Sequence, residues 1–114
     1  MNITFEKAGE ILQVGLEGKI SSVNAAQVEA DLLAQIAKGE SDLLVDMGRL
    51  DYISSAGLRV VLLVAKKLKQ SGGVLVLFGM QSQIREVFDI SGFLSILTVT
   101  DTREQALTHF SHLG

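Results

Sequence analysis

With 114 residues, 47% of them hydrophobic, the chain is long enough for one domain with a buried core and too short for two. Its 13 acidic and 10 basic residues are scattered along the sequence and give a net charge of -3, which argues against nucleic-acid binding. The absence of cysteine excludes disulfides and thiolate metal sites, and the longest apolar run, residues 60–65, is too short for membrane insertion.

The first third of the chain predicts two strands followed by a helix. Apolar and polar residues alternate over residues 3–5 and 12–16, on either side of a turn at residues 8–10, which favours a pair of strands. From Asn24 the period changes to that of a helix ending near Gly39. The apolar stripe of this helix is Ala25, Val28, Leu32 and Ile36.

The middle of the chain predicts a strand, a helix and a second strand. Residues 43–47 and 74–78 are short apolar runs, typical of parallel strands covered on both faces. Residues 56–70 predict the helix, and the glycine pair at residues 72–73 favours its termination. We expect Lys66, Lys67 and Lys69 to lie in solvent near the end of this helix, where their charges complement the helix dipole.

The last third of the chain continues the alternation. Residues 81–89 predict a shorter helix and residues 96–99 a short strand. A C-terminal helix follows, with an apolar face made of Ala106, Leu107, Phe110 and Leu113. Two residue pairs in the chain have the spacing of a capping box, namely Asn24 with Gln27 and Thr102 with Gln105.

This order of elements predicts the fold class. Alternating strands and helices indicate a single α/β domain with a mixed, mostly parallel sheet of about five strands and about four helices. Ligands and partners of such sheets meet the loops beyond the carboxyl ends of the strands, which here are residues 18–24, 48–55 and 79–82. We expect one domain that spans residues 1–114 and is a monomer in isolation. We expect it in the cytoplasm, because the chain opens on a strand-like pattern instead of an apolar secretory signal.

Two serines stand where the strand should give way to the central helix. The first turn of a helix presents unpaired N–H groups and a partial positive charge, so a hydroxyl there tolerates an added phosphate. Ser54 and Ser55 therefore suggest a phosphorylation switch. The alternative is a plain helix cap, worth about 1 kcal/mol. Two serines where one would cap, with the small residues Ala56 and Gly57 beside them, favour the switch.

Other chemistries fit the chain less well. A hydrolase elbow, Gly-x-Ser-x-Gly, needs a glycine where Ile53 stands and follows its strand without an intervening loop. The two histidines, His109 and His112, lie near the end of the chain, where we expect them in solvent. Asp46 and Asp51 fit loop and turn carboxylates better than a phosphoacceptor or metal site. We expect no catalytic residue, no metal and no cofactor.

Three segments together resemble a known family. They are LDYISSAGLR at residues 50–59, the glycine pair at 72–73 before a strand, and VFDISGF at residues 87–93. The chain is similar, over essentially its whole length, to a STAS domain of the anti-sigma factor antagonist family. The resemblance implies partner switching: the unphosphorylated antagonist binds a serine kinase that doubles as an anti-sigma factor, phosphorylation abolishes binding, and a metal-dependent serine phosphatase resets the system.

The resemblance also implies site residues. The phosphorylated serine of the family falls on Ser55, with Ser54 as second choice. This chain has Ser54 where many members have an aspartate, and Ser21 where they have an acidic residue. The partner-binding residues implied are Ser21, Ser22, Asn24, Ser54, Ser55, Ala56, Gly57, Arg59, Met80 and Gln81. The alternative is an unphosphorylated structural subunit of a membrane transport assembly, because STAS domains also occur there.

Overall fold

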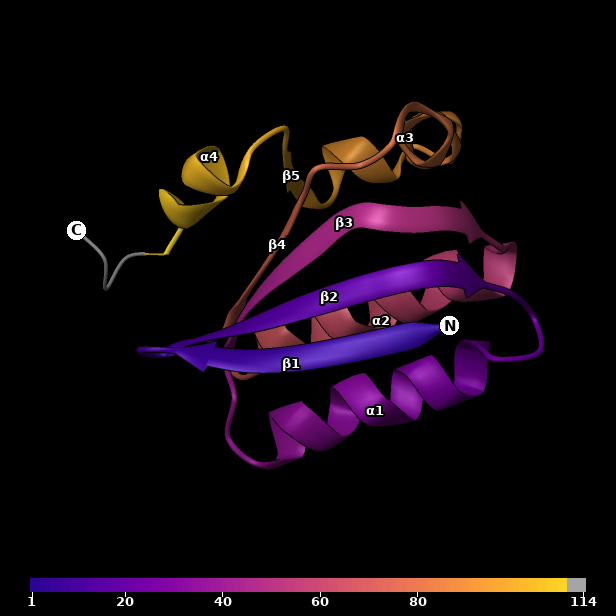
Figure 1. The fold of residues 1–114 in the computed structure, drawn as a ribbon. Coiled ribbons are helices and arrows are strands. Elements are labelled where there is room, and N and C mark those ends of the chain that lie inside the picture. The colour runs from indigo at the N-terminus through magenta and orange to yellow at the C-terminus, as the bar shows by residue number, and fades with distance from the viewer. Residues whose placement is uncertain (111–114) are drawn as a thin grey trace.

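The computed structural model describes residues 1–110 and shows a five-stranded sheet with helices on both faces (Figure 1). The strands follow the order β1-β2-β3-β4-β5, with β1 antiparallel to β2 and every other neighbouring pair parallel. This arrangement confirms the predicted α/β class and the mixed, mostly parallel sheet. In chain order the elements are β1 Asn2–Ala8, β2 Ile11–Ile20, α1 Ala25–Ala37, β3 Asp42–Ile53, α2 Ser55–Gln70, β4 Val74–Phe78, α3 Ser82–Ile90, the 3-10 helix η1 Phe93–Ser95, β5 Thr98–Thr100 and α4 Arg103–Leu107.

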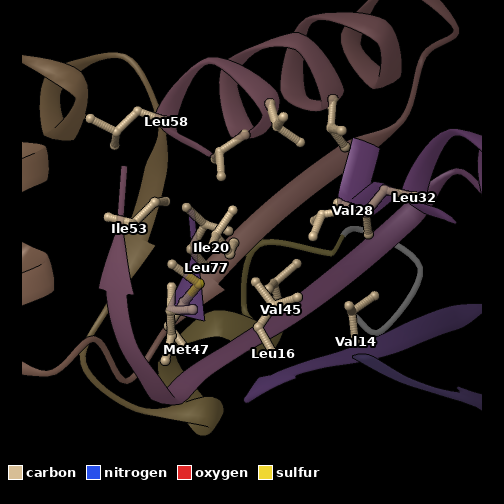
Figure 2. Packing of buried hydrophobic residues seen from close by; sticks show 14 of the residues in the cluster. Val14, Leu16, Ile20, Val28, Leu32, Val45, Met47, Ile53, Leu58 and Leu77 are labelled. Atoms are coloured by element: carbon tan, nitrogen blue, oxygen red, sulfur yellow. The ribbon is translucent and has the colours of Figure 1, made fainter. Parts of the chain in front are cut away.

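The core lies mainly between the sheet and the pair α1 and α2. Side chains at alternate positions of β3 point to opposite faces, so Leu43 and Val45 face this core while Leu44 faces α4. Figure 2 shows the main cluster, in which strand residues such as Val45 and Leu77 meet Val28 and Leu58 from the helices. On the opposite face, a smaller cluster around α4 consists of Ile11, Leu44, Val76, Ala106 and Phe110.

Strand β3 is longer than the sequence predicts. Residues 48–53, expected in a loop, continue the strand beside β2. The register contains one extra β3 residue between Asp46 and Arg49 and another between Leu50 and Tyr52, so the strand carries two bulges. These insertions change the inward-facing spacing from two residues to three. The regular alternation that identifies a strand in a sequence is therefore lost there.

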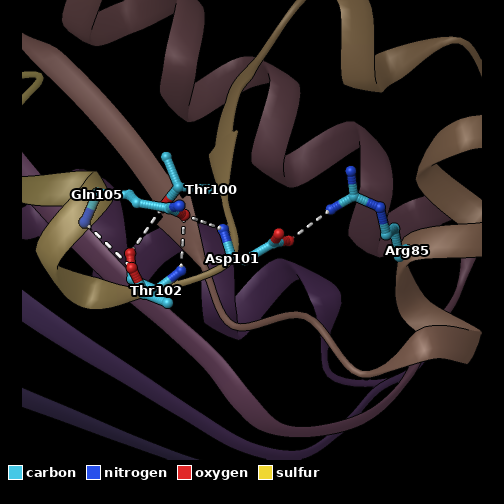
Figure 3. A network of polar contacts seen from close by, with 5 residues as sticks. All are labelled: Arg85, Thr100, Asp101, Thr102 and Gln105. Carbon is cyan, nitrogen blue, oxygen red and sulfur yellow. Dashed lines mark hydrogen bonds and ion pairs between the residues drawn. The ribbon is translucent and has the colours of Figure 1, made fainter.

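The predicted caps and strand ends have mixed outcomes. Thr102 and Gln105 form the expected capping box: the Gln105 N–H donates to Thr102 Oγ1 (3.2 Å), and Gln105 Oε1 accepts from the Thr102 N–H (3.2 Å) (Figure 3). The capping box at Asn24 is wrong, because the Asn24 side chain makes no cap hydrogen bond. Strand β5 lies two residues beyond the predicted start, since η1 occupies the chain before it.

The predictions for the C-terminal residues can be compared with the structure only as far as residue 110. Phe110 is buried, as predicted, whereas His109 is exposed in the turn after α4. The predictions for Leu113 and His112 lie outside the described residues. None of the helices in residues 1–110 combines the length and the hydropathy that a bilayer-spanning segment requires.

Candidate functional site

The two serines lie at the junction of β3 and α2, held against the end of β2. Ile20 and Ile53 are paired where the two strands finish, and the Ser54 N–H donates to the Ile20 carbonyl (2.8 Å). The first helical turn packs tightly on this pair because residue 57 is a glycine. A Cβ added to Gly57 would lie 2.8 Å from side-chain carbons of both Ile20 and Ile53. The start of α2 is therefore fixed relative to the sheet.

The two serine hydroxyls have different roles in the fold. Ser54 is the N-cap of α2, and its Oγ accepts a hydrogen bond from the Gly57 N–H (3.1 Å). Ser55 is the first helical residue, and its side chain is exposed and makes no hydrogen bond within residues 1–110. The N–H groups of Ser55 and Ala56 also have no partner in this part of the chain. One hydroxyl thus stabilises the helix, and the other is accessible to a visiting molecule.

The loop between β2 and α1, residues 21–24, lies beside the serines and is ordered by its own asparagine. Asn24 Oδ1 accepts from the Ser21 N–H (2.8 Å), and Asn24 Nδ2 donates to the Lys19 carbonyl (2.9 Å). Ser21 Oγ in turn accepts from the Val23 N–H (3.2 Å). Ser21 and Asn24 are partly buried, whereas Ser22 is exposed. Of these three predicted residues, Ser22 offers its side chain most freely.

The loop between β4 and α3, residues 79–81, contacts the middle of β3 instead of the serines. Gln81 Nε2 donates to the Gly48 carbonyl (3.1 Å) and to Asp51 Oδ1 (3.0 Å). Met80 is partly buried against the core. The predicted site therefore divides, with residues 21–24 and 54–57 adjacent and Met80 and Gln81 placed along β3. Arg59 is exposed one helical turn after Ser55 and forms no ion pair within the described residues.

Two exposed apolar residues near the serines are not among the site residues predicted from the sequence. Val23, in the loop beside them, is 92% exposed, and Tyr52, two residues before Ser54, is 49% exposed. Exposed apolar side chains beside a polar site are typical of protein interfaces. The only signal in the sequence is that Val23 interrupts a run of polar loop residues. Tyr52 gives no such signal, because its exposure depends on the bulges in β3.

The geometry gives little support to a hydrolase, a phosphoacceptor aspartate or a metal site. Ser54 alone separates β3 from α2, so the loop expected before the serines is absent, but Ile53 still occupies the place of the first glycine in a hydrolase elbow. Asp46 and Asp51, expected in a loop, belong to β3; Asp46 Oδ1 accepts from the Gly48 N–H (2.8 Å). Within residues 1–110, no cluster of three histidine or acidic side chains could hold a metal ion.

The sequence matches a known domain family and a known bacterial protein over most of its length. The STAS domain family matches residues 2–106. The chain is 54% identical over 110 residues to BtrV of Bordetella bronchiseptica, which is named an anti-sigma factor antagonist; the match covers 96% of this chain and 95% of BtrV.

Solved structures of low sequence identity share the fold. An anti-sigma factor antagonist from Thermotoga maritima superimposes with a TM-score of 0.89 at 17% identity, over 94% of this chain and 92% of that one. The phosphorylated form of SpoIIAA, a cell fate determinant of Bacillus, gives a TM-score of 0.72 at 23% identity, over 95% of this chain and 98% of that one.

Proposed function

The chain belongs to the anti-sigma factor antagonists of the STAS-domain family, and on this premise we propose that it acts by partner switching with Ser55 as the phosphoacceptor. Members of this family are regulators and not enzymes. In the proposed cycle the unphosphorylated protein binds a serine kinase that is also an anti-sigma factor, and thereby frees the sigma factor. Phosphorylation of Ser55 ends that binding, and a metal-dependent serine phosphatase restores it.

The observation that carries the proposal is that the Ser54 hydroxyl is used in a hydrogen bond and the Ser55 hydroxyl is not. Ser54 Oγ already holds the Gly57 N–H, so its modification would remove a helix cap. The Ser55 side chain is exposed and makes no hydrogen bond in the described part of the chain, so a kinase can reach it without disturbing the fold. This difference favours Ser55 over Ser54, which was the second choice on sequence grounds.

The start of α2 also suits the product of the reaction. A phosphate on Ser55 adds a charge of about -1.5 to -2 and three acceptor oxygens. The N–H groups of Ser55 and Ala56, which have no partner within residues 1–110, and the positive end of the helix dipole favour an anion at this position. We therefore expect the phosphorylated protein to keep its fold, and the switch to act on the partner interface.

The surface around Ser55 supports binding by the kinase. Exposed Val23 and Tyr52 provide apolar contact area, and Ser22 and Arg59 add exposed polar groups. Because antagonists of this family are not enzymes, the kinase would provide ATP, magnesium and the catalytic base. Changing the bound fraction from 1:99 to 99:1 requires about 5.5 kcal/mol of differential affinity. Repulsion and desolvation of the phosphate in a close interface must supply most of it, because a helix dipole contributes only about 0.3–2 kcal/mol.

The test is phosphorylation by the cognate kinase followed by mass-spectrometric mapping of the modified residue. Ser55→Ala should abolish incorporation of phosphate, whereas Ser91→Ala, a matched control at an exposed serine outside the predicted partner surface, should leave it unchanged. Ser55→Asp should weaken kinase binding in a titration of the two proteins. Phosphate that still enters the Ser55→Ala variant would refute the assignment of the acceptor.

A second measurement separates this function from the structural alternative. The protein is purified from its own cells, in the cytoplasmic fraction where we propose that it acts, and the associated proteins are identified. A serine kinase would support partner switching. A transporter ATPase, with Ser55 unmodified in every growth condition, would instead favour a constitutive subunit of a membrane transport assembly.

A further inference from the structure

A groove lies along α2 on the side that faces the last strand of the sheet. Its volume is about 780 Å³, which is within the range of specific ligand sites. One wall is helix α2, and the other is formed by the starts of β4 and β5 together with the two residues before β5. The residues that line it are Arg59, Leu62, Leu63, Ala65, Lys66, Lys69, Gly73, Val74, Leu75, Ile96, Leu97 and Thr98.

Helix α2 therefore carries two apolar faces. Its buried face packs on the sheet through residues such as Val60, Val64 and Leu68. The groove face carries the partly buried Leu62 and the exposed Leu63. A helix that only closes a core needs one apolar stripe, with polar residues elsewhere. The second apolar face is thus in excess of what the fold requires.

The opposite wall of the groove shows the same excess. Ile96 is 68% exposed and Leu63 is 39% exposed, so two of the large exposed apolar residues in the described chain line one groove. Apolar groups that meet in a hollow and remain in contact with water mark a binding surface more often than single exposed residues do.

The charges around this groove have one sign. Arg59, Lys66 and Lys69 line it, and no acidic residue does, although the chain as a whole has a net charge of -3. From Arg59 to Lys69 the helix rises about 15 Å, so the cations are spread along the groove instead of gathered at one end. A ligand with a single anionic head could pair with only one end of this row. Carboxylates repeated along an extended partner would match all of it.

We propose that this groove binds an acidic amphipathic helix of a partner protein, in a surface that shares Arg59 with the region around Ser55 and extends from there along α2. The apolar side of that helix would pack against Leu62, Leu63 and Ile96, and its carboxylates would face Arg59, Lys66 and Lys69. Helix-in-groove recognition reads apolar side chains at helical spacing and selects partners by the charges beside them. This surface goes beyond the proposed switch, because it lies along α2 and not at its first turn.

The test uses a synthetic peptide of about five helical turns, with leucine at helical spacing on one face and glutamate elsewhere. It is titrated into the isotope-labelled full chain while backbone amide shifts are recorded. The groove-lining residues should shift together as the peptide saturates the protein. A scrambled peptide of the same composition, and a version with lysine in place of glutamate, should bind at least about tenfold more weakly, because both apolar alignment and charge are required.

Matched variants show whether the groove itself is responsible. Lys66→Glu with Lys69→Glu should weaken binding about tenfold, whereas Lys67→Glu, exposed on the same helix but outside the groove, should have little effect. Ile96→Ser should weaken binding, and Ile90→Ser, at an exposed isoleucine outside the groove, should not. These substitutions are at exposed positions, so folding is checked by circular dichroism and expected to be unchanged.

Several outcomes would overturn the proposal. Absence of shifts at the groove, equal binding of the scrambled peptide, or shifts confined to residues elsewhere would each refute it. Binding to anionic lipid vesicles without binding to the peptide would assign the groove to a membrane surface. Self-association that Lys66→Glu with Lys69→Glu disrupts would assign it to a second copy of this chain. None of these results bears on phosphorylation of Ser55, which is measured separately.

Discussion

The different roles of Ser54 and Ser55 can be separated by two alanine substitutions. Ser54→Ala removes the side-chain oxygen that accepts from the Gly57 N–H at 3.1 Å, and loss of such a cap costs about 1 kcal/mol. Ser55→Ala removes an exposed hydroxyl that makes no hydrogen bond in the described structure. Its effect on the free energy of unfolding should stay within about 0.5 kcal/mol. The two variants should therefore differ in stability although they are neighbours in the chain.

The expected difference is large enough to measure. With an unfolding entropy of about 2.1 cal/mol/K per residue, 114 residues give about 0.24 kcal/mol/K, so loss of the cap should lower the Tm by about 4 °C. In urea, with a slope of about 2 kcal/mol/M, the midpoint should fall by about 0.5 M. Both transitions are followed by circular dichroism, and the slope should not change.

The matched control is Ser54→Asp. A carboxylate at the N-cap accepts from the same N–H and interacts favourably with the helix dipole, so this variant should keep the stability that Ser54→Ala loses. Kinase assays on the same proteins should give the opposite ranking, with phosphate lost only in Ser55→Ala. A destabilised Ser55→Ala beside a neutral Ser54→Ala would show that the roles of the hydroxyls have been assigned the wrong way round.

Three further predictions concern packing, each measured as the free energy of unfolding in urea. Gly57→Ala should cost about 1–3 kcal/mol, because its Cβ would lie 2.8 Å from Ile20 Cγ2; a stabilised protein would contradict the close packing. Gly73→Ala should cost more than Gly57→Ala, since its Cβ would lie 2.2 Å from the Ser41 carbonyl oxygen and the backbone must move; the reverse order would count against this. Phe88→Ala should cost about 3–5 kcal/mol, because the ring is fully buried, and a loss below about 1 kcal/mol would show that the site collapses.

Much of the fold follows from periodicity in the sequence. The helical stripe through Val28 and Leu32 and the apolar run that begins at Leu43 lie in segments with regular secondary structure. Local pattern and tertiary packing agree there, so the pattern is informative. The second half of β3 is different, because its bulges exist only through pairing with β2. A buried residue at every third position matches neither the two-residue period of a strand nor the 3.6-residue period of a helix.

The candidate site shows the same limit. That a serine caps α2 follows from the residue types, but which serine does so depends on where the strand ends, and β3 runs on to Ile53. Asn24 was expected to cap α1 and instead bridges its own loop, since Asx side chains bond turns as readily as helix ends. Gln81 is held by Gly48 and Asp51, contacts about thirty residues distant in sequence that no local pattern could predict.

The bridge made by Asn24 would affect how fast the proposed partners associate. Its two hydrogen bonds hold the loop of residues 21–24 in one shape before any partner arrives. Ordering a flexible loop at the moment of encounter would cost entropy and slow productive collisions. In the proposed partner surface this ordering is complete before association, which diffusion and orientation would then limit. In the proposed cycle, exchange between competing complexes would then follow changes in kinase activity without delay from the antagonist itself.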